Sequence, residues 1–437
     1  MERVSHYKWW LVAMLWGIAF FNYADRQAVF SLFPLLGKEL HLSQVQRGLL
    51  GSSFAWTYGL CSPFAGLLVD RVRRKSAILG GLYAWSLICM ATALSRTLGS
   101  LVFFRAAEGL GETFYFPASV SMLSDYHGPR TRSRALGIHQ TSVYMGTIAG
   151  GYFAALIAQA YGWRSSFIVF GGLGMLLGLL LTRFLIEPQR GASDGVTEPA
   201  ISEISKVDAD VARNTEAASH RISLLEFLRI LRETPSAMLL MGAFVCANFV
   251  AIVLLSWMPQ FLFDKFNVGL AVAGLAATIF VQLASMAGAP IGGWLADTAR
   301  ARFPGGRMLV QAIGVFGGAP FVLLCGITRS AAWTVVALIA WGLFKGLYDA
   351  NIFASIFDVV PPEARGTAAG FMNMVGWLGG GSAPVVIGYI ADHRSLSLAI
   401  SMTAAMYVLA GVLLVVGMVK FATRDAARVQ KMMEVNG

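Results

Sequence analysis

The chain has 437 residues, of which 56% are hydrophobic and only 13% are charged. Soluble domains carry about 25% charged residues, so this composition excludes an ordinary soluble domain and favours an integral protein of the lipid bilayer. The formal net charge is +10, but the basic residues lie in short loops between apolar segments, which argues against a nucleic-acid-binding surface. The four cysteines lie in four separate apolar segments, and we predict neither a disulfide framework nor a metal site.

Apolar segments long enough to cross about 30 Å of hydrocarbon as helices recur twelve times along the chain. They cover approximately residues 9–36, 47–69, 76–96, 98–125, 135–160, 163–186, 236–263, 270–296, 307–328, 331–360, 366–391 and 396–420. The first is too long for the core of a secretory signal peptide, so we expect it to stay in the membrane. We therefore predict an all-α membrane protein with twelve transmembrane helices.

A polar stretch separates the sixth apolar segment from the seventh. It divides the chain into an N-terminal six-helix bundle (1–187), a cytoplasmic linker (188–235), a C-terminal six-helix bundle (236–420) and a cytoplasmic tail (421–437). The end of the linker, Leu224 to Glu233, has the apolar spacing of an amphipathic helix. We expect this helix to lie on the membrane surface, and a solvated linker helix is the alternative.

Lysine and arginine are distributed unevenly over the loops. The loops after the second, fourth and eighth segments and the tail are rich in Lys and Arg, whereas the loops on the opposite side hold about one each. Because basic loops stay on the cytoplasmic side, we expect both termini in the cytoplasm.

The fourth apolar segment contains three ionisable residues, Arg105, Glu108 and Glu112. Their spacing of three and four residues places them along one stripe of a helix. A charge at the middle of a bilayer costs about 2.5–3.5 kcal/mol on insertion scales, so such groups normally face a bundle interior or a wet cavity. Two carboxylates beside one guanidinium leave one negative charge in excess, which a single proton cancels. The stripe therefore predicts a proton-binding site in a membrane transporter.

An internal repeat supports the division into two bundles. Gly66-Leu-Leu-Val-Asp70 recurs as Gly293-Trp-Leu-Ala-Asp297, at an offset of 297 − 70 = 227, and each copy ends the second helix of its bundle. Arg132-Ser-Arg-Ala-Leu-Gly is echoed by Arg365-Gly-Thr-Ala-Ala-Gly, at an offset of 365 − 132 = 233. Repeated six-helix halves around a central site are typical of alternating-access carriers.

These motifs resemble a known family of transporters. The loop Gly66-x-x-x-Asp70-Arg71-x-x-Arg74-Lys75 is similar to the signature loop of the major facilitator superfamily. Asn22-Tyr-Ala-Asp-Arg26, Trp56-Thr-Tyr58 and the stretch from Arg105 to Pro117 resemble the anion:cation symporters, which include bacterial sugar-acid transporters, sialin and the vesicular glutamate transporters. The resemblance implies that Asp25 and Glu112 exchange protons, that Arg26 with Tyr23 and Tyr58 contacts an anionic substrate, and that Arg105 orients the carboxylates.

Estimates of depth along each helix place charged residues from separate helices at about the same level in the membrane. At about 1.5 Å per residue, Asp25 and Arg26 lie about 24–26 Å from the inner face, Glu112 about 20 Å and Lys345 about 22 Å. A guanidinium suits a substrate carboxylate because it binds bidentately and stays charged. The alternative for Arg26 is a permanent pair with a fourth-helix glutamate, and for Glu108 a static pair with Arg105.

The second bundle has candidate residues of its own. Lys345 either pairs internally with Asp349 at i, i+4 or gives the second bundle a positive contact suited to a dianion or a longer acid. We also assign Asn373 to the substrate site. The aromatic residues Trp341 and Trp377, like Phe114, Tyr115 and Phe116 of the first bundle, are expected to serve packing or face lipid.

Five residues of the repeated loops are expected to control the conformation. Charge pairs and helix ends at the cytoplasmic meeting of the two bundles can hold the outward-facing state and release it. This assignment covers Gly66, Asp70, Arg71, Arg74 and Asp297.

We therefore predict a proton-coupled symporter of a small organic anion, a carboxylate or sugar acid, in a bacterial-type inner membrane. The alternative is a spinster-like or drug-type exporter of amphipathic or lysolipid substrates. A sensor or membrane enzyme is a third class, but no Ser-His-Asp arrangement, zinc spacing or phosphate loop favours it. We expect no cofactor besides the proton gradient, no nucleic-acid partner and a monomer.

Overall fold

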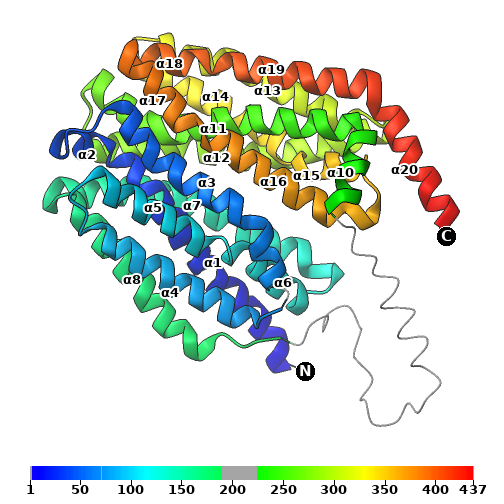
Figure 1. Cartoon of the computed structure of the whole chain (residues 1–437), viewed down its shortest axis with the longest axis horizontal. Coiled ribbons are helices and arrows are strands. Elements are labelled where there is room, and N and C mark those ends of the chain that lie inside the picture. Colours follow the sequence, from blue (N-terminus) through cyan, green and yellow to red (C-terminus); the bar gives the residue numbers. More distant parts are fainter. Residues whose placement is uncertain (1, 70, 189–223, 437) are drawn as a thin grey trace.

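The computed structural model describes residues 2–69, 71–188 and 224–436, and within these ranges the chain is helical without any strand (Figure 1). The first group of helices consists of α1 (Glu2–Ser31), α2 (Phe33–Glu39), α3 (Gln44–Val69), α4 (Arg74–Thr92), α5 (Leu98–Glu112), α6 (Tyr115–Tyr126), α7 (Pro129–Tyr161) and α8 (Trp163–Phe184). The second group consists of α10 (Leu224–Glu233), α11 (Pro235–Phe266), α12 (Leu270–Arg302), α13 (Gly306–Ile327), α14 (Ala331–Asp349), α15 (Ile352–Phe357), the 3₁₀ turn Pro362–Ala364, α16 (Arg365–Gly381), α17 (Ala383–His393), α18 (Leu396–Met402), α19 (Ala404–Val416), the π-helical turn Gly417–Ala422 and α20 (Thr423–Asn436).

Eight helical segments of the described chain, all between Thr131 and Lys431, are long and apolar enough to cross a membrane. The four segments expected before them are helical as well, as α1, α3, α4 and the α5–α6 pair. Large apolar side chains such as Phe64, Leu176 and Trp294 are exposed on the outer surface, whereas Trp85, Trp163, Trp257 and Trp341 are fully buried. This distribution fits a helical protein whose surrounding solvent is lipid.

The two groups of helices lie side by side, with α1–α8 below and α10–α20 above in Figure 1. Both ends of the chain lie toward the same end of the molecule, to the right in this view, and α2 and α18 lie at the opposite end. We call these the terminal end and the distal end.

The fourth long helix of each group is broken just after an acidic residue. In the first group α5 ends at Glu112 and α6 begins at Tyr115, and in the second α14 ends at Asp349 and α15 begins at Ile352. The two acids are 349 − 112 = 237 positions apart, and Glu108 and Lys345 have the same offset. The internal repeat thus extends to these ionisable residues, whose matching positions in the two groups the sequence motifs did not show.

Glycines allow the two groups to touch at the distal end. A Cβ added to Gly274 of α12 would lie 2.0 Å from the carbonyl oxygen of Gly151 on α7, and one added to Gly48 of α3 would lie 2.2 Å from that of Pro384 on α17. No side chain fits at either crossing unless the backbones separate.

Within the described residues, the two groups are joined by hydrogen bonds at the distal end and beside the cavity. Asp392 of α17 accepts from the backbone N–H groups of Gln44 (2.8 Å) and Val45 (3.0 Å) at the start of α3. The remaining bonds of this kind join Gln27 to Leu255, Trp56 to Ser382 and Gln260 to Gln44. The structure is therefore one in which the distal end is closed.

The end of the linker and the tail dock on the second group. Phe227 of α10 is fully buried and contacts the ring of Phe371 on α16, at 5.6 Å between ring centroids. Asp425 of α20 accepts from the backbone N–H and the side-chain hydroxyl of Ser236, in the first turn of α11. The predicted amphipathic helix is thus present, and its phenylalanine packs in the core. The linker residues 189–223 lie outside the described part of the chain.

Candidate functional site

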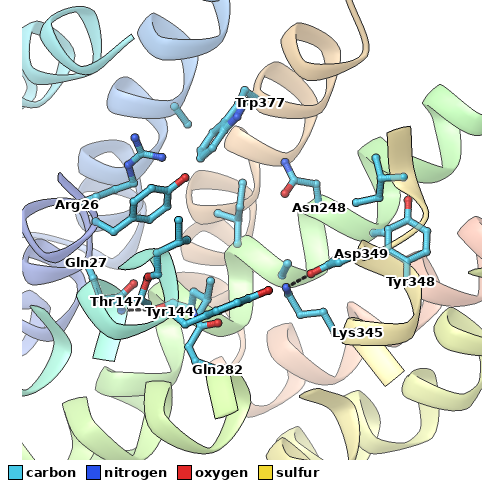
Figure 2. A pocket seen from close by; sticks show the side chains of 18 of the residues that line it. Arg26, Gln27, Tyr144, Thr147, Asn248, Gln282, Lys345, Tyr348, Asp349 and Trp377 are labelled. Carbon is cyan, nitrogen blue, oxygen red and sulfur yellow. Dashed lines mark hydrogen bonds and ion pairs between the residues drawn. The ribbon is translucent and has the colours of Figure 1, made fainter. Parts of the chain in front are cut away.

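A cavity of about 540 Å³ lies between the two groups of helices (Figure 2). Apolar side chains form much of its wall, including Phe30, Phe54, Phe244 and Trp377. The polar and charged lining residues are Tyr23, Arg26, Gln27, Gln140, Tyr144 and Thr147 from the first group and Asn248, Gln282, Lys345, Tyr348, Asp349 and Tyr407 from the second. An apolar chamber with a few convergent polar groups is typical of a small-molecule site.

Arg26 of α1 forms part of the cavity wall and is 8% exposed. Its Nη2 and Nε donate to Oε2 of Glu112, at 2.7 and 3.2 Å. Four aromatic rings surround the guanidinium carbon at 4.6–5.3 Å from their centroids, those of Tyr23, Phe54, Tyr58 and Trp377. Cation–π contacts therefore fix this side chain in addition to the ion pair.

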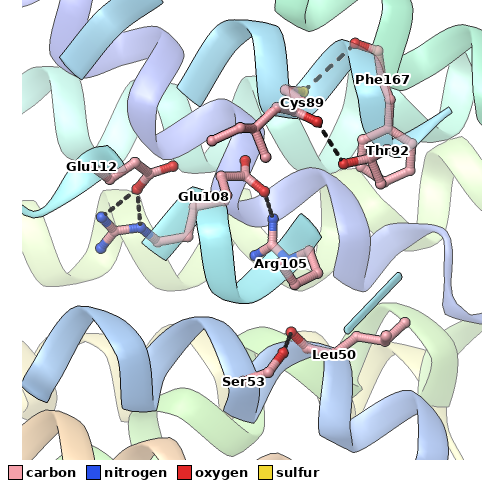
Figure 3. A network of polar contacts seen from close by, with 10 residues as sticks. Leu50, Ser53, Cys89, Thr92, Arg105, Glu108, Glu112 and Phe167 are labelled. Atoms are coloured by element: carbon pink, nitrogen blue, oxygen red, sulfur yellow. Dashed lines mark hydrogen bonds and ion pairs between the residues drawn. The ribbon is translucent and has the colours of Figure 1, made fainter. Parts of the chain in front are cut away.

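Asp25 and Glu108 do not line the cavity, and Figure 3 shows Glu108 beside Arg105. Oxygens of Asp25 and Glu108 and the sulfur of Cys89 lie within 4.8 Å of one another. Arg105 donates to Glu108 at 2.5 Å and stacks on the Phe54 ring at 4.8 Å. Neither oxygen of Asp25 has a hydrogen-bond partner within the described residues.

The charges of this buried cluster do not balance. Three carboxylates, those of Asp25, Glu108 and Glu112, accompany two guanidiniums, those of Arg26 and Arg105, and all five residues are buried. A net buried charge is costly in a medium without water. One bound proton makes the cluster neutral, and Asp25 is the acid without a cation partner in the described chain.

The structure contains the ion pairs that were alternatives to the predicted roles. Arg26 is paired with a fourth-helix glutamate, and Arg105 is paired with Glu108. Glu112 contacts Arg26, but neither Asp25 nor Glu112 lines the cavity, and both are buried in the first group. Depth alone could not show this, because it does not fix the rotation of a helix about its axis.

In the second group Lys345 is paired with Asp349 one helical turn away. Both residues line the cavity, on the side opposite Arg26, and the ring of Tyr144 on α7 extends toward them (Figure 2). The side chain of Lys345 is 13% exposed and that of Asp349 is 31% exposed. Water in the cavity can therefore reach this pair more easily than the pair formed by Arg26.

Two predicted substrate residues are not in the cavity wall. Tyr58 lies behind Arg26 and is 6% exposed. Asn373 of α16 is half-buried and does not line the cavity, whereas Trp377, one turn further along the same helix, does. Trp377 was expected to serve packing or face lipid, and the i, i+4 relation to Asn373 is the signal that could have found it.

Two of the predicted gating residues, Arg74 and Asp297, lie near the terminal end and form ion pairs within their own group. Arg74 pairs with Asp125 of α6, and its backbone N–H donates to Glu187 at 2.9 Å. Asp297 pairs with Arg307 at 2.9 Å. Asp358 accepts a hydrogen bond from Arg300 at 3.1 Å and forms an ion pair with Arg307 at 3.1 Å. The acids Asp125, Glu187 and Asp358 were missed.

The remaining gating predictions concern the second helix of the first group. Arg71 is exposed, and a Cβ added to Gly66 would meet no atom within 4 Å in the described chain. Asp70 lies outside the described residues.

Comparisons with known proteins agree on a fold and a broad class. The sequence profile of the Major Facilitator Superfamily matches residues 15–384 and 258–431. The hexuronate transporter of Bacillus subtilis (strain 168) is 27% identical over 381 residues, which cover 85% of each chain. The probable galactarate/D-glucarate transporter of Escherichia coli (strain K12) is 21% identical over 402 residues, or 89% of this chain and 88% of the relative.

Spinster proteins are similar as well. Protein spinster of Drosophila melanogaster is 25% identical over 403 residues, which cover 90% of this chain and 63% of the relative. A crystal structure of a bacterial homologue of the human lysosomal transporter spinster, in an inward-facing and unoccupied conformation, superposes with a TM-score of 0.76 at 20% identity. That match covers 97% of this chain and 98% of the other.

Proposed function

Because the chain belongs to the major facilitator superfamily and has relatives that transport organic anions, we propose that it is a secondary transporter of a small organic anion, a carboxylate or sugar acid, coupled to protons. The observation that supports this most directly is Arg26, a permanent cation in the cavity wall whose counterion is a buried glutamate. A transporter needs no chemical step, and the protein is not an enzyme.

The proposed topology has twelve membrane spans and places the terminal end in the cytoplasm of a bacterial-type inner membrane. The two groups of helices then act as the two transport halves, 1–187 and 236–420, joined by the linker 188–235 and followed by the tail 421–437. With this orientation the closed distal end is the extracellular side.

The proposed mechanism exchanges a proton for an ion pair. When Glu112 takes up a proton it no longer needs Arg26, and the guanidinium becomes free for a substrate carboxylate, which it binds through two N–H groups. Release of the substrate and of the proton restores the pair. Oxygens of Asp25 and Glu108 lie within 4.8 Å of each other, and the cluster is neutral with one bound proton, so both acids can take part in proton transfer. Tyr23 and Tyr58 keep the guanidinium in place.

Reconstitution of the purified protein in liposomes that contain a pH-sensitive dye tests this function. Under an inward proton gradient, at least one acid from a panel of carboxylates and sugar acids should accelerate proton entry and accumulate inside. Protein-free liposomes and addition of a protonophore are the controls. If no acid in the panel stimulates proton entry or binds the protein, the proposal is wrong.

A second candidate is export of amphipathic or lysolipid substrates. The similarity to spinster over 90% of the chain favours it, as do the aromatic walls of the cavity, which include Phe30, Phe54, Phe244, Phe353 and Trp377. The two candidates predict different results when a lysolipid and an acid are added together. In a lipid exporter the lysolipid should displace any bound acid, whereas an anion symporter should still bind the acid in the presence of the lysolipid.

A further inference from the structure

The cavity has a cation on each side. Of the lining residues described, Arg26 and Lys345 are the cations, and they belong to different groups of helices and lie opposite one another (Figure 2). Each has its own acid, Glu112 for Arg26 and Asp349 for Lys345. Both cations are thus neutralised within the protein when no substrate is present.

The Lys345–Asp349 pair occupies the position in the second group that Glu108 and Glu112 occupy in the first. Both pairs have i, i+4 spacing, and in both the helix breaks immediately after the acid. An ion pair within a membrane is costly to desolvate, and the cavity leaves this pair partly hydrated and open to a solute. Its position indicates contact with the solute.

The two acids differ in their freedom to leave their cations. Glu112 has a fully buried side chain, whereas the side chain of Asp349 is 31% exposed. Water in the cavity can hydrate the Asp349 carboxylate when another anion takes its place on Lys345. Exchange at Lys345 therefore needs no burial of an unpaired charge, and Tyr144 offers a hydroxyl group toward the same point.

We propose that Lys345 is a second anion-binding group, and that the preferred solute is a dicarboxylate whose two ends are bound by Arg26 and Lys345. This inference rests on the proposed function, since it assumes that an anion binds Arg26. A monoanion replaces only one of the two internal acids, whereas a dianion can replace both.

Binding of straight-chain dicarboxylates of increasing length, each compared with its own monoamide, tests the proposal. The monoamide has the same length and lacks one charge. At the best length the purified wild-type protein should bind the dicarboxylate about tenfold or more tighter, the ratio expected for one charge-assisted hydrogen bond. In Lys345→Met this ratio should fall to about one, and in Lys345→Arg it should be retained. Lys38→Met, an exposed lysine of α2, is the matched control and should keep the wild-type ratio.

Asp349→Asn provides an independent check, because it removes the internal competitor for Lys345. The dicarboxylate should bind more tightly to this variant than to the wild type. Equal affinities of wild-type protein for a dicarboxylate and its monoamide at every length would overturn the proposal while leaving anion transport intact. Binding of no acid at all by the wild type would instead overturn the proposed function.

Discussion

At the scale of single residues, the environment of Arg26 combines a fixed position with a removable partner. The four rings around the guanidinium cannot move without repacking α1, α3 and α16, whereas the bond to Glu112 depends on the charge of that carboxylate. A ligand that brings its own carboxylate can therefore replace Glu112 without displacing the arginine. A planar, always charged group suits this use better than an ammonium.

Replacement of Arg26 by lysine should weaken substrate binding by about 10- to 100-fold. The ammonium keeps the charge but loses the bidentate hydrogen bond and the planar stacking, and charge-assisted hydrogen bonds contribute about 1.5–3 kcal/mol each. Isothermal titration with the best acid from the panel measures the loss. Arg164→Lys, at an ion pair with Glu39 that is partly open to solvent, is the control. Unchanged affinity in Arg26→Lys would contradict the role of Arg26 as the anion site.

Replacement of Glu112 by glutamine should abolish accumulation driven by a proton gradient and leave exchange of substrate across the membrane. A neutral amide mimics the protonated acid, so Arg26 stays free at every pH. In the wild type, protonation of Glu112 frees Arg26, so substrate affinity should rise as the pH falls. In the variant the affinity should be high and independent of pH. A wild-type pH profile in the variant would assign the coupling proton to another acid, with Asp25 first in line because it lacks a partner in the described chain.

At the scale of helices, hydropathy predicts where segments lie but not where they break. The segments 98–125 and 331–360 are long and mainly apolar and were expected as single helices, yet each is interrupted, after Glu112 and after Asp349. Depth estimates put Arg26, Glu112 and Lys345 near one level, and in the structure Arg26 bonds to Glu112 and lines the same cavity as Lys345. They could not assign Asp25 to the interior of the first group or Trp377 to the cavity, because facing depends on how whole helices pack against their neighbours.

The close contact between α7 and α12 leads to a testable prediction about closure of the distal end. Valine at position 274 would place a Cβ 2.0 Å from the carbonyl oxygen of Gly151, so Gly274→Val should prevent closure of the distal end. Spin labels at Lys38 and Arg329, exposed positions of the two groups at this end, should then move apart in a cysteine-free background. Gly172→Val is the control, since a Cβ there meets no atom within 4 Å in the described chain. An unchanged distance distribution would show that the crossing does not limit closure.

At the scale of the whole molecule, the two ends are held by different kinds of contact. The distal end is closed by bonds between the two groups, whereas the ion pairs described at the terminal end, such as Arg74 with Asp125 and Asp297 with Arg307, stay within one group. Alternating access then requires the distal bonds to break as others form at the terminal end. The relative strength of the two sets determines how the protein divides its time between states.

Asp392 is the residue through which this balance is best tested, because its carboxylate accepts two backbone N–H groups at the start of a helix in the other group. A carboxylate at a helix N-terminus contributes about 0.5–2 kcal/mol, so its loss should shift the ratio of distally closed to distally open molecules by roughly 2- to 30-fold. Asparagine keeps an acceptor without the charge, whereas alanine removes both. The Lys38–Arg329 distance distribution should therefore shift toward the open state in the order wild type, Asp392→Asn, Asp392→Ala. If both variants matched the wild type, the distal closure would not depend on this carboxylate, and the glycine crossings and the other hydrogen bonds between the groups would hold it.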